Sequence, residues 1–182
     1  MLPEALLTLS PPRLPERTGS ERQFVRLAQE YGSNIRVADV INASDASHFI
    51  AWKRNGWLAP FVPEDVAKLY PAEHRDAEGM FASFRVWVSI IAYNTDQVKK
   101  EEAPKSFADL LDPKWEGKIV KAHPGYSGTI MTATYQMARD LGWDYFDKLA
   151  KENVLQVQSS VYPPKKLALG ERAVMADGND FN

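Results

Sequence analysis

Cysteine is absent from this sequence and histidine is scarce. Of 182 residues none is cysteine and three are histidine. The lack of cysteine excludes disulfides, thiolate zinc sites and a cysteine nucleophile. His48, His74 and His123 do not have the spacing of a metal-binding helix face. We therefore expect each of them to be a surface or capping residue.

The chain also lacks a basic excess and a long apolar run. Lys and Arg number 22 against 24 Asp and Glu, which gives a net charge of −2 and predicts no nucleic-acid partner. Apolar stretches such as residues 86–93 fall far short of the roughly 20 residues of a membrane helix. Residues 1–15 have no basic start and no small-residue cleavage site, so we expect a disordered leader and no signal peptide as the chain is written.

Hydrophobic periodicity predicts alternating helices and strands from residue 20 onward, and hence an α/β fold with a mainly parallel sheet. Ser20 with Gln23, and Ser106 with Asp109, predict capping boxes. Helices are predicted over residues 20–31, 46–55, 64–69, 106–112, 129–141, 144–153 and 163–169. Strands are predicted over residues 35–41, 81–93, 118–121, 154–157 and 172–176, the second of them buried on both faces.

Three polar turns, residues 18–20, 42–45 and 123–129, each precede a predicted helix. Ligands of open α/β sheets bind beyond the carboxyl ends of the strands, where helix N-termini attract anions. Gly19, Gly125 and Gly128 would allow a ligand to approach the backbone closely. The turns together indicate a ligand cleft, and the alternative is that they are ordinary caps and turns.

Signatures of catalysis are missing. No G-x-S-x-G, H-E-x-x-H or G-x-x-x-x-G-K-[ST] pattern occurs, and Ser127 has no evident base, so we expect no enzyme. Among the aromatic residues, Trp57 and Tyr126 lie beside turns and are the candidates for a cleft wall.

The stretch P-x-S-x-x-D-L-L-D-P-K-W-x-G-K-I at residues 104–119 resembles the extracellular solute-binding proteins of ferric-iron-type ABC importers. Weaker similarities keep the order of that family and extend the resemblance over residues 16–182. They lie at residues 17–21, 38–40, 44–45, 92–95 and 170–171.

This resemblance implies a type II periplasmic-binding fold, in which two lobes with mainly parallel sheets close on a ligand. It implies a first lobe over residues 16–90, a hinge strand over 85–94, a second lobe over 95–174 and the start of a return crossing over 175–182. Against the family pattern we expect this chain to be incomplete at both ends, without the signal peptide, the opening β-α unit and the return into the first lobe.

The resemblance also implies ligand-binding residues, which would form hydrogen bonds and break no bond in the solute. These are Thr18, Gly19, Ser20, Ser44, Asp45, Tyr126, Ser127, Gly128, Thr129, Ser159 and Asn179. Iron-binding members carry two adjacent tyrosines where this chain has Asp180 and Phe181, and of these only Asp180 could offer an oxygen to a metal. The solute is therefore either a ferric ion with a companion anion or an anionic or polar organic molecule.

On this resemblance we expect a monomeric substrate-binding component of a bacterial ABC importer, periplasmic as in the family, that meets permease subunits in the complete protein. Two alternatives stay open. One is a truncated remnant that binds nothing, and the other is an enzyme or effector domain on the same fold.

Overall fold

The structure is a computed structural model that describes residues 18–178. Its sheet has four strands in the order β1-β4-β2-β3. The strands are β1 Ala92–Tyr93, β2 Ile119–Ala122, β3 Leu155–Val157 and β4 Val174–Asp177. β2 runs parallel to both β3 and β4, while β1 is antiparallel to β4. The mainly parallel α/β architecture predicted from the sequence is confirmed.

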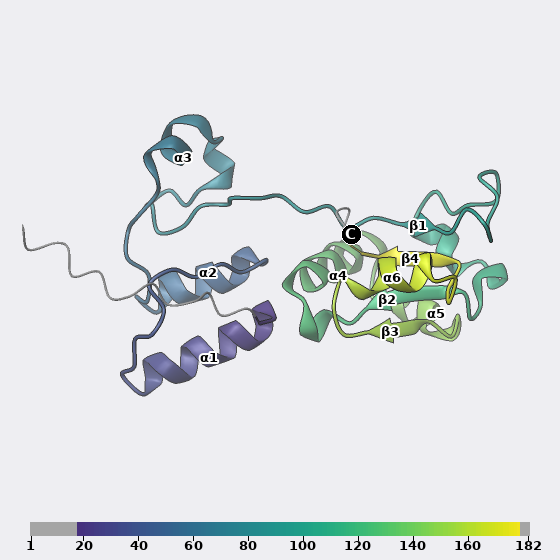
Figure 1. Ribbon diagram of the computed structural model, residues 1–182, viewed down its shortest axis with the longest axis horizontal. Helices are drawn as coiled ribbons and strands as arrows, with labels where there is room; N and C mark the ends of the chain where they lie inside the picture. Colours follow the sequence, from purple (N-terminus) through teal and green to yellow (C-terminus); the bar gives the residue numbers. More distant parts are fainter. Residues whose placement is uncertain (1–17, 179–182) are drawn as a thin grey trace, which may run out of the picture.

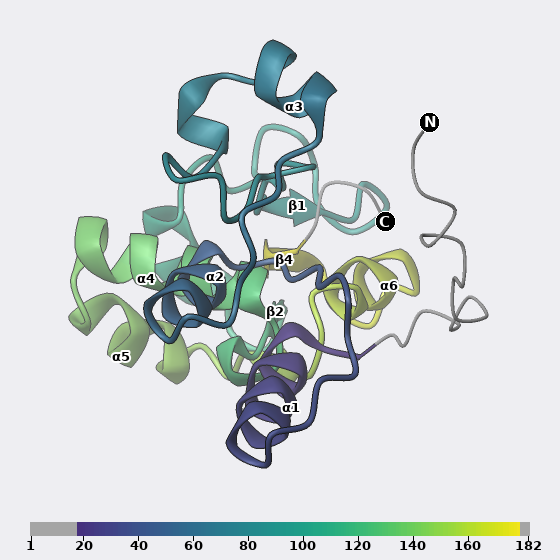
Figure 2. The same ribbon diagram turned by 90° about the vertical axis from the view of Figure 1, so that its left-hand side faces the viewer.

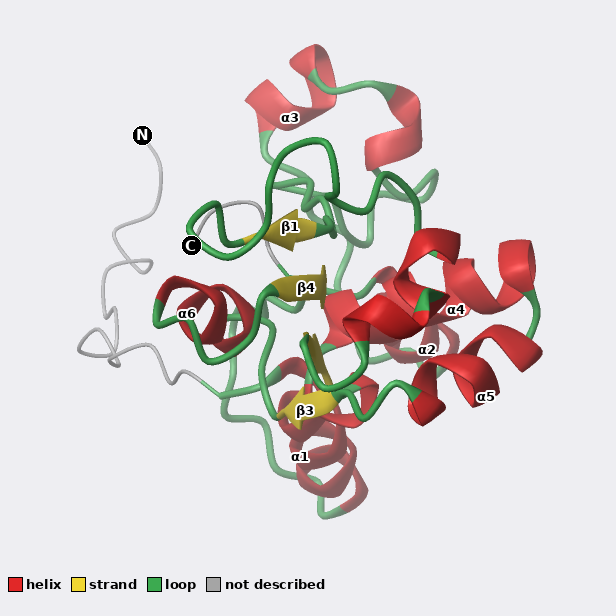
Figure 3. Cartoon of the chain, turned by 90° about the vertical axis from the view of Figure 1, so that its right-hand side faces the viewer, coloured by secondary structure: helices red, strands yellow, loops and turns green. Residues whose placement is uncertain are grey.

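Helices cover both faces of this sheet (Figures 2 and 3). α4 Gly128–Leu141 and α5 Asp144–Lys151 lie on one face, and α6 Tyr162–Ala168 lies on the other. The core between the sheet and the first two helices includes fully buried Ile119 and Val174, with Met137 from α4 and Leu149 from α5. Burial on both faces explains why β2 and β4 are almost continuously apolar.

Three further helices, α1 Ser20–Gly32, α2 Ala46–Arg54 and α3 Glu64–Leu69, precede the sheet in the chain. Figure 1 shows them beside the sheet and its helices, joined to β1 by an extended segment. We call residues 18–91 the helical lobe and residues 92–178 the sheet lobe. α1 and α2 pack through Phe24, His48 and Trp52, whose rings lie 4.8 to 5.9 Å apart.

Two predicted strands of the helical lobe are wrong. Residues 35–41 form no strand, and Ile35 and Val40 are 49% and 88% exposed. Of residues 81–93 only β1 is a strand, and Val86 and Val88 are 66% and 52% exposed instead of buried on both faces. Alternating apolar side chains become a strand only beside a partner that takes up the backbone hydrogen bonds. Among the described residues, 35–41 pair with no strand, and 81–91 make only isolated contacts, such as the bridge of Ala82 with Arg75 and the Ile90 amide that donates to the Gly178 carbonyl at 3.3 Å.

The motif at residues 104–119 folds into two 3-10 helices, Ala108–Leu111 and Pro113–Trp115, followed by β2. Asp109 Oδ2 accepts hydrogen bonds from the amides of Lys105 and Ser106 at 2.8 and 2.9 Å, and its own amide donates to Ser106 Oγ at 3.3 Å. The predicted capping box is therefore present, although it opens a 3-10 helix instead of an α-helix.

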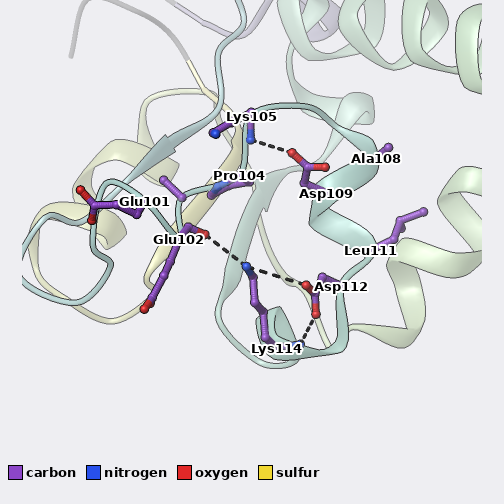
Figure 4. A pocket seen from close by; sticks show the side chains of 10 residues that line it. Glu101, Glu102, Pro104, Lys105, Ala108, Asp109, Leu111, Asp112 and Lys114 are labelled. Carbon is purple, nitrogen blue, oxygen red and sulfur yellow. Dashed lines mark hydrogen bonds and ion pairs between the residues drawn. The ribbon is translucent and has the colours of Figure 1, made fainter.

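This motif also surrounds a hollow on the surface of the sheet lobe (Figure 4). Lys114 crosses it, with Nζ 3.2 Å from the carbonyl oxygen of Glu102 and 3.7 Å from Asp112 Oδ2. The amide of Lys114 also donates to Asp112 Oδ1 at 3.0 Å. These groups bond to one another, so the polar residues of the motif stabilise the turn before β2. None of the described helices is both long and apolar enough to cross a membrane.

Candidate functional site

Two of the three polar turns meet at the start of α1. Ser20 Oγ lies 2.9 Å from Ser44 Oγ and accepts a hydrogen bond from the Ser44 amide at 3.1 Å. Gly19, not Ser20, is the N-cap of α1, and no side chain caps the helix. The capping box predicted for Ser20 and Gln23 is wrong, because the Ser20 hydroxyl faces Ser44 instead of the helix amides.

Asp45 connects the second turn to the sheet lobe. Its Oδ1 accepts from the Ser47 amide at 2.8 Å and so caps α2, as residues of this type commonly do. Its Oδ2 accepts from Thr132 Oγ1 of α4 at 2.9 Å. Asp45 is 8% exposed while Thr132 is exposed, so this carboxylate forms a partly buried hydrogen bond between the two lobes.

Glycine allows the lobes to touch at this point. A Cβ at Gly128 would lie 2.9 Å from the Asp45 Cβ and 3.0 Å from Ser44 Oγ, closer than side chains tolerate. A Cβ at Gly19 would lie 3.3 Å from the carbonyl oxygen of Tyr126. All three predicted turns therefore meet, which agrees with the hypothesis of one shared site.

The N-terminus of α4 faces this meeting point. Ser127 is its N-cap, is 9% exposed and makes no side-chain capping bond. The first hydrogen bond of the helix runs from the Met131 amide to the Ser127 carbonyl at 2.9 Å. The amides of the first turn and their partial positive charge are thus the groups that an anion would approach, with the Ser127 and Thr129 hydroxyls beside them.

The loop between β2 and α4 is a 3-10 helix, Pro124–Tyr126. His123 caps it, since its Nδ1 accepts from the Gly125 amide at 3.0 Å. The rings of His123 and Tyr126 lie 5.3 Å apart, and Tyr126 is 46% exposed. His123 therefore has the capping role that we expected, and Tyr126 packs against it with part of its surface exposed.

Ser159 lies two residues beyond Val157, whose carbonyl accepts from the His123 amide at 2.8 Å, and so lies at the same edge of the sheet as the third turn. Ser159 Oγ accepts from the Val161 amide at 3.5 Å, in the turn before α6. Trp57 packs its ring 4.8 Å from Tyr31 at the far end of α1, about 16 Å along the helix from Ser20. This overturns its assignment as a cleft wall. Thr18 is half-buried just before Gly19, and Asn179, Asp180 and Phe181 lie outside the described residues.

Sequence reasoning missed Thr132. It follows Gly128 by four residues, so both lie on one face of α4 and point to the same neighbour. The four-residue spacing of Gly128 and Thr132 can be read from the sequence, but only the structure shows that Asp45 is the neighbour they share.

Sequence reasoning also missed a buried ion pair behind the loop. Lys121 of β2 donates from Nζ to Asp177 Oδ2 of β4, and Asp177 Oδ1 accepts from the Ala122 amide at 2.8 Å. The two residues are 4% and 0% exposed. Burial raises the pKa of the Asp177 carboxyl above its ordinary value, although Lys121 and the Ala122 amide act in the opposite direction. The pair joins the ends of β2 and β4 directly before the loop that carries Ser127.

Within residues 18–178, no three or more His, Asp or Glu side chains gather in a way that could hold a metal ion. The prediction of a surface or capping position is wrong for His48, which is 4% exposed and packs against the rings of Phe24 and Trp52, with Nε2 3.3 Å from Glu21 Oε2. The described part of the site thus offers amides and hydroxyls with one carboxylate, Asp45.

Comparison with known proteins supports the fold. The solved structure of iron-bound HitA from Pseudomonas aeruginosa has a TM-score of 0.72 at 24% identity, over 87% of this chain and 52% of that one. The binding protein AfuA from Actinobacillus pleuropneumoniae, with exogenous fructose-6-phosphate bound, has a TM-score of 0.75 at 27% identity over 90% and 54%. The two-lobed type II fold is therefore confirmed.

A curated relative gives the same result. The probable ABC transporter periplasmic-binding protein y4fP of Sinorhizobium fredii is 30% identical over 146 residues, which are 75% of this chain and 40% of that protein. The chain spans about half the length of the relatives that it matches. Residues 36–175 match the family model of bacterial extracellular solute-binding proteins, and the chain belongs to that family.

Proposed function

We propose that this chain is the solute-binding component of an ABC importer and holds a small solute between its two lobes. The observation that carries this proposal is the meeting of the three turns, joined by the Ser20–Ser44 contact and the Asp45–Thr132 hydrogen bond. Hydrogen bonds in such a sheltered place count for more than they do in water.

The solute we propose is an organic anion, and among these a phosphorylated sugar. Its anionic group would lie at the first turn of α4, against the amides of Gly128 and Thr129 and the Ser127 hydroxyl. Ser20 and Ser44 would face it from the helical lobe, with Thr18 and Gly19 beside them and Tyr126 stacked on its carbon skeleton. The fructose-6-phosphate bound to AfuA supports this class of solute.

A ferric ion with a companion anion is the second candidate. The iron-bound HitA supports it, as does the carboxylate of Asp45 beside the proposed anion position. Hard oxygen ligands suit this ion, but among the described residues no three His, Asp or Glu side chains gather with Asp45 to hold it. We therefore favour the organic anion.

The antiparallel pairing of β1 with β4 fits a hinge between the lobes. Ala92 pairs with Met175 and Tyr93 with Val174, and the Ile90 amide donates to the Gly178 carbonyl at 3.3 Å. We propose that residues 85–94 leave the first lobe, that residues 95–174 form the second, and that residues 175–182 begin the return. In the complete protein we propose a periplasmic monomer that delivers its solute to permease subunits.

Isothermal titration of the chain with fructose-6-phosphate, fructose and ferric citrate tests the proposed function. We expect fructose-6-phosphate to bind and fructose to bind much more weakly, since fructose has no anionic group for α4. Binding of ferric citrate alone would favour the second candidate, and binding of none of the three would overturn the proposal.

Replacing Ser127 with alanine removes one hydroxyl at the anion position. A hydrogen bond to a charged group contributes about 1.5 kcal/mol or more, so the affinity for fructose-6-phosphate should fall about tenfold. The matched control is Ser33→Ala, at an exposed C-cap of α1, which should leave the affinity unchanged. If both variants bound fructose-6-phosphate with equal affinity in the same titration, Ser127 would not be a ligand-binding residue.

A further inference from the structure

Asp45 is an unusual residue for a site that receives an anion. Asp45 is 8% exposed and lies against the first turn of α4, where the Gly128 backbone approaches its Cβ. A fixed negative charge at this position opposes a second negative charge nearby. The Asp45 carboxylate therefore needs partners that hold it at this position, and its charge affects which anions can bind there.

Two hydrogen bonds hold the carboxylate in place. Ser47 donates from the same lobe at 2.8 Å and Thr132 from the other lobe at 2.9 Å. The Thr132 bond is the one that depends on how the lobes sit relative to each other, so its loss should free the carboxylate and loosen the contact at Gly128.

We propose that Asp45, positioned by Thr132, selects solutes that carry hydroxyl groups beside their anionic group and rejects bare inorganic anions. This inference rests on the proposed function and adds the source of its selectivity. A carboxylate accepts hydrogen bonds from sugar hydroxyls, and charge-assisted bonds of this kind are strong. An inorganic phosphate at the turn of α4 has at most its own acidic hydrogens to offer and meets the charge of Asp45 directly.

The substitution Asp45→Asn should change the affinities for the two classes of solute by different amounts. Asparagine keeps the cap of α2 and a hydrogen-bonding oxygen but removes the charge. At the effective dielectric of a protein surface, removing a like charge several ångströms away should tighten inorganic phosphate about tenfold. The phosphate group of fructose-6-phosphate is also repelled less in the variant, but the sugar hydroxyls lose a charged acceptor. The ratio of the affinity for fructose-6-phosphate to the affinity for inorganic phosphate should therefore fall about tenfold.

Isothermal titration of the wild-type chain and of Asp45→Asn with fructose-6-phosphate and with inorganic phosphate measures the ratio of the two affinities in each protein. An unchanged ratio of affinities in the variant would overturn the proposal, even if both solutes bound. If the wild-type chain bound neither solute, the proposed function would fail instead, and the selectivity with it.

A readout without solute tests the positioning role of Thr132. The chain has no cysteine, so Gln29→Cys in α1 and Asp147→Cys in α5, both exposed, give unique spin labels on the two lobes. Thr132→Val keeps the shape and removes the donor, and we expect the distance between the labels to lengthen or broaden.

Thr134→Val is the matched control, because the Thr134 hydroxyl lies on the same helix and has no hydrogen-bond partner. Its distance distribution should match that of the parent chain. An equal distribution for Thr132→Val and Thr134→Val would show that the Asp45–Thr132 bond does not hold the lobes, and would overturn the positioning role whatever solute binds.

Discussion

At the scale of single residues, Gly128 controls how closely the lobes approach. An added methyl group would lie 2.9 Å from the Asp45 Cβ and 3.0 Å from Ser44 Oγ, so the helical lobe would have to move away. Because the φ angle of Gly128 is not positive, alanine strains no backbone there and acts only through this contact.

We expect Gly128→Ala to weaken solute binding at least tenfold, as overpacking of a fitted contact commonly costs 1–3 kcal/mol, roughly the energy of a tenfold change or more. Calorimetric titration measures this loss. Gly32→Ala is the control, because a Cβ at Gly32 meets nothing within 4 Å. Wild-type affinity in Gly128→Ala would contradict the close contact between the lobes.

At the scale of secondary structure, the Lys121–Asp177 pair joins β2 to β4. Lys121→Met would leave the buried Asp177 carboxylate with the Ala122 amide but without its cation. Removing one partner of a buried pair typically destabilises a protein by about 3–5 kcal/mol. We expect a loss of this size in urea unfolding.

Lys118→Met, at an exposed position three residues earlier, is the control and should change stability little. The double variant Lys121→Met with Asp177→Leu should recover much of the loss, because no uncompensated charge then remains in the core. A single variant as stable as the wild type would show that the pair is not buried as described.

The loop after α3 depends on a second ion pair. Lys53 Nζ of α2 lies 2.7 Å from Asp76 Oδ1, and this hydrogen bond holds the pKa of the Asp76 carboxyl below its ordinary value of 3.8. A depressed pKa in the folded state means that the stabilisation is present above pH 3.8 and is lost as the pH falls through the lower folded value.

Thermal unfolding between about pH 2.5 and pH 7 tests this sign. Asp76→Asn should lower the melting temperature at neutral pH, and its difference from the wild type should shrink as the medium becomes more acidic. Glu73→Gln, at an exposed position, is the control. A difference that stays constant over this pH range would contradict the role of the Asp76 charge.

At the scale of the whole molecule, apolar burial is uneven. The sheet lobe has a compact core, whereas the extended segments of the helical lobe expose large apolar side chains such as Val40 and Val86. Regions with few buried contacts open most readily, so we expect amide hydrogens of residues 35–41 and 84–90 to exchange fastest and those of β2 and β4 slowest.

Hydrogen exchange measured by mass spectrometry gives this comparison directly. Saturating solute should slow exchange at residues 18–20, 44–45 and 126–129, because a ligand bound only by the folded state stabilises it by about 2.7 kcal/mol at one hundred times its dissociation constant. Uniform exchange along the chain would contradict the difference between the lobes.

The helices and the core strands were predictable because their causes are local. α1, α2 and α3 follow from apolar spacing and from stops such as Gly32, and β2 and β4 from short apolar runs that two helical layers cover. Residues 35–41 and 81–91 carry the pattern of strands, but a strand also needs a neighbour, which no local pattern guarantees.

The sequence by itself determined the α/β class, the family and the three polar turns that make up the candidate site. Only the tertiary structure decided that Asp45 reaches Thr132, that Gly128 lies against Ser44, and that Lys121 meets Asp177 across the sheet. These pairs are 87, 84 and 56 positions apart in the chain, as the numbering of their members shows. Contacts over such separations arise from the packing of whole elements, which the periodicity of a single segment does not encode.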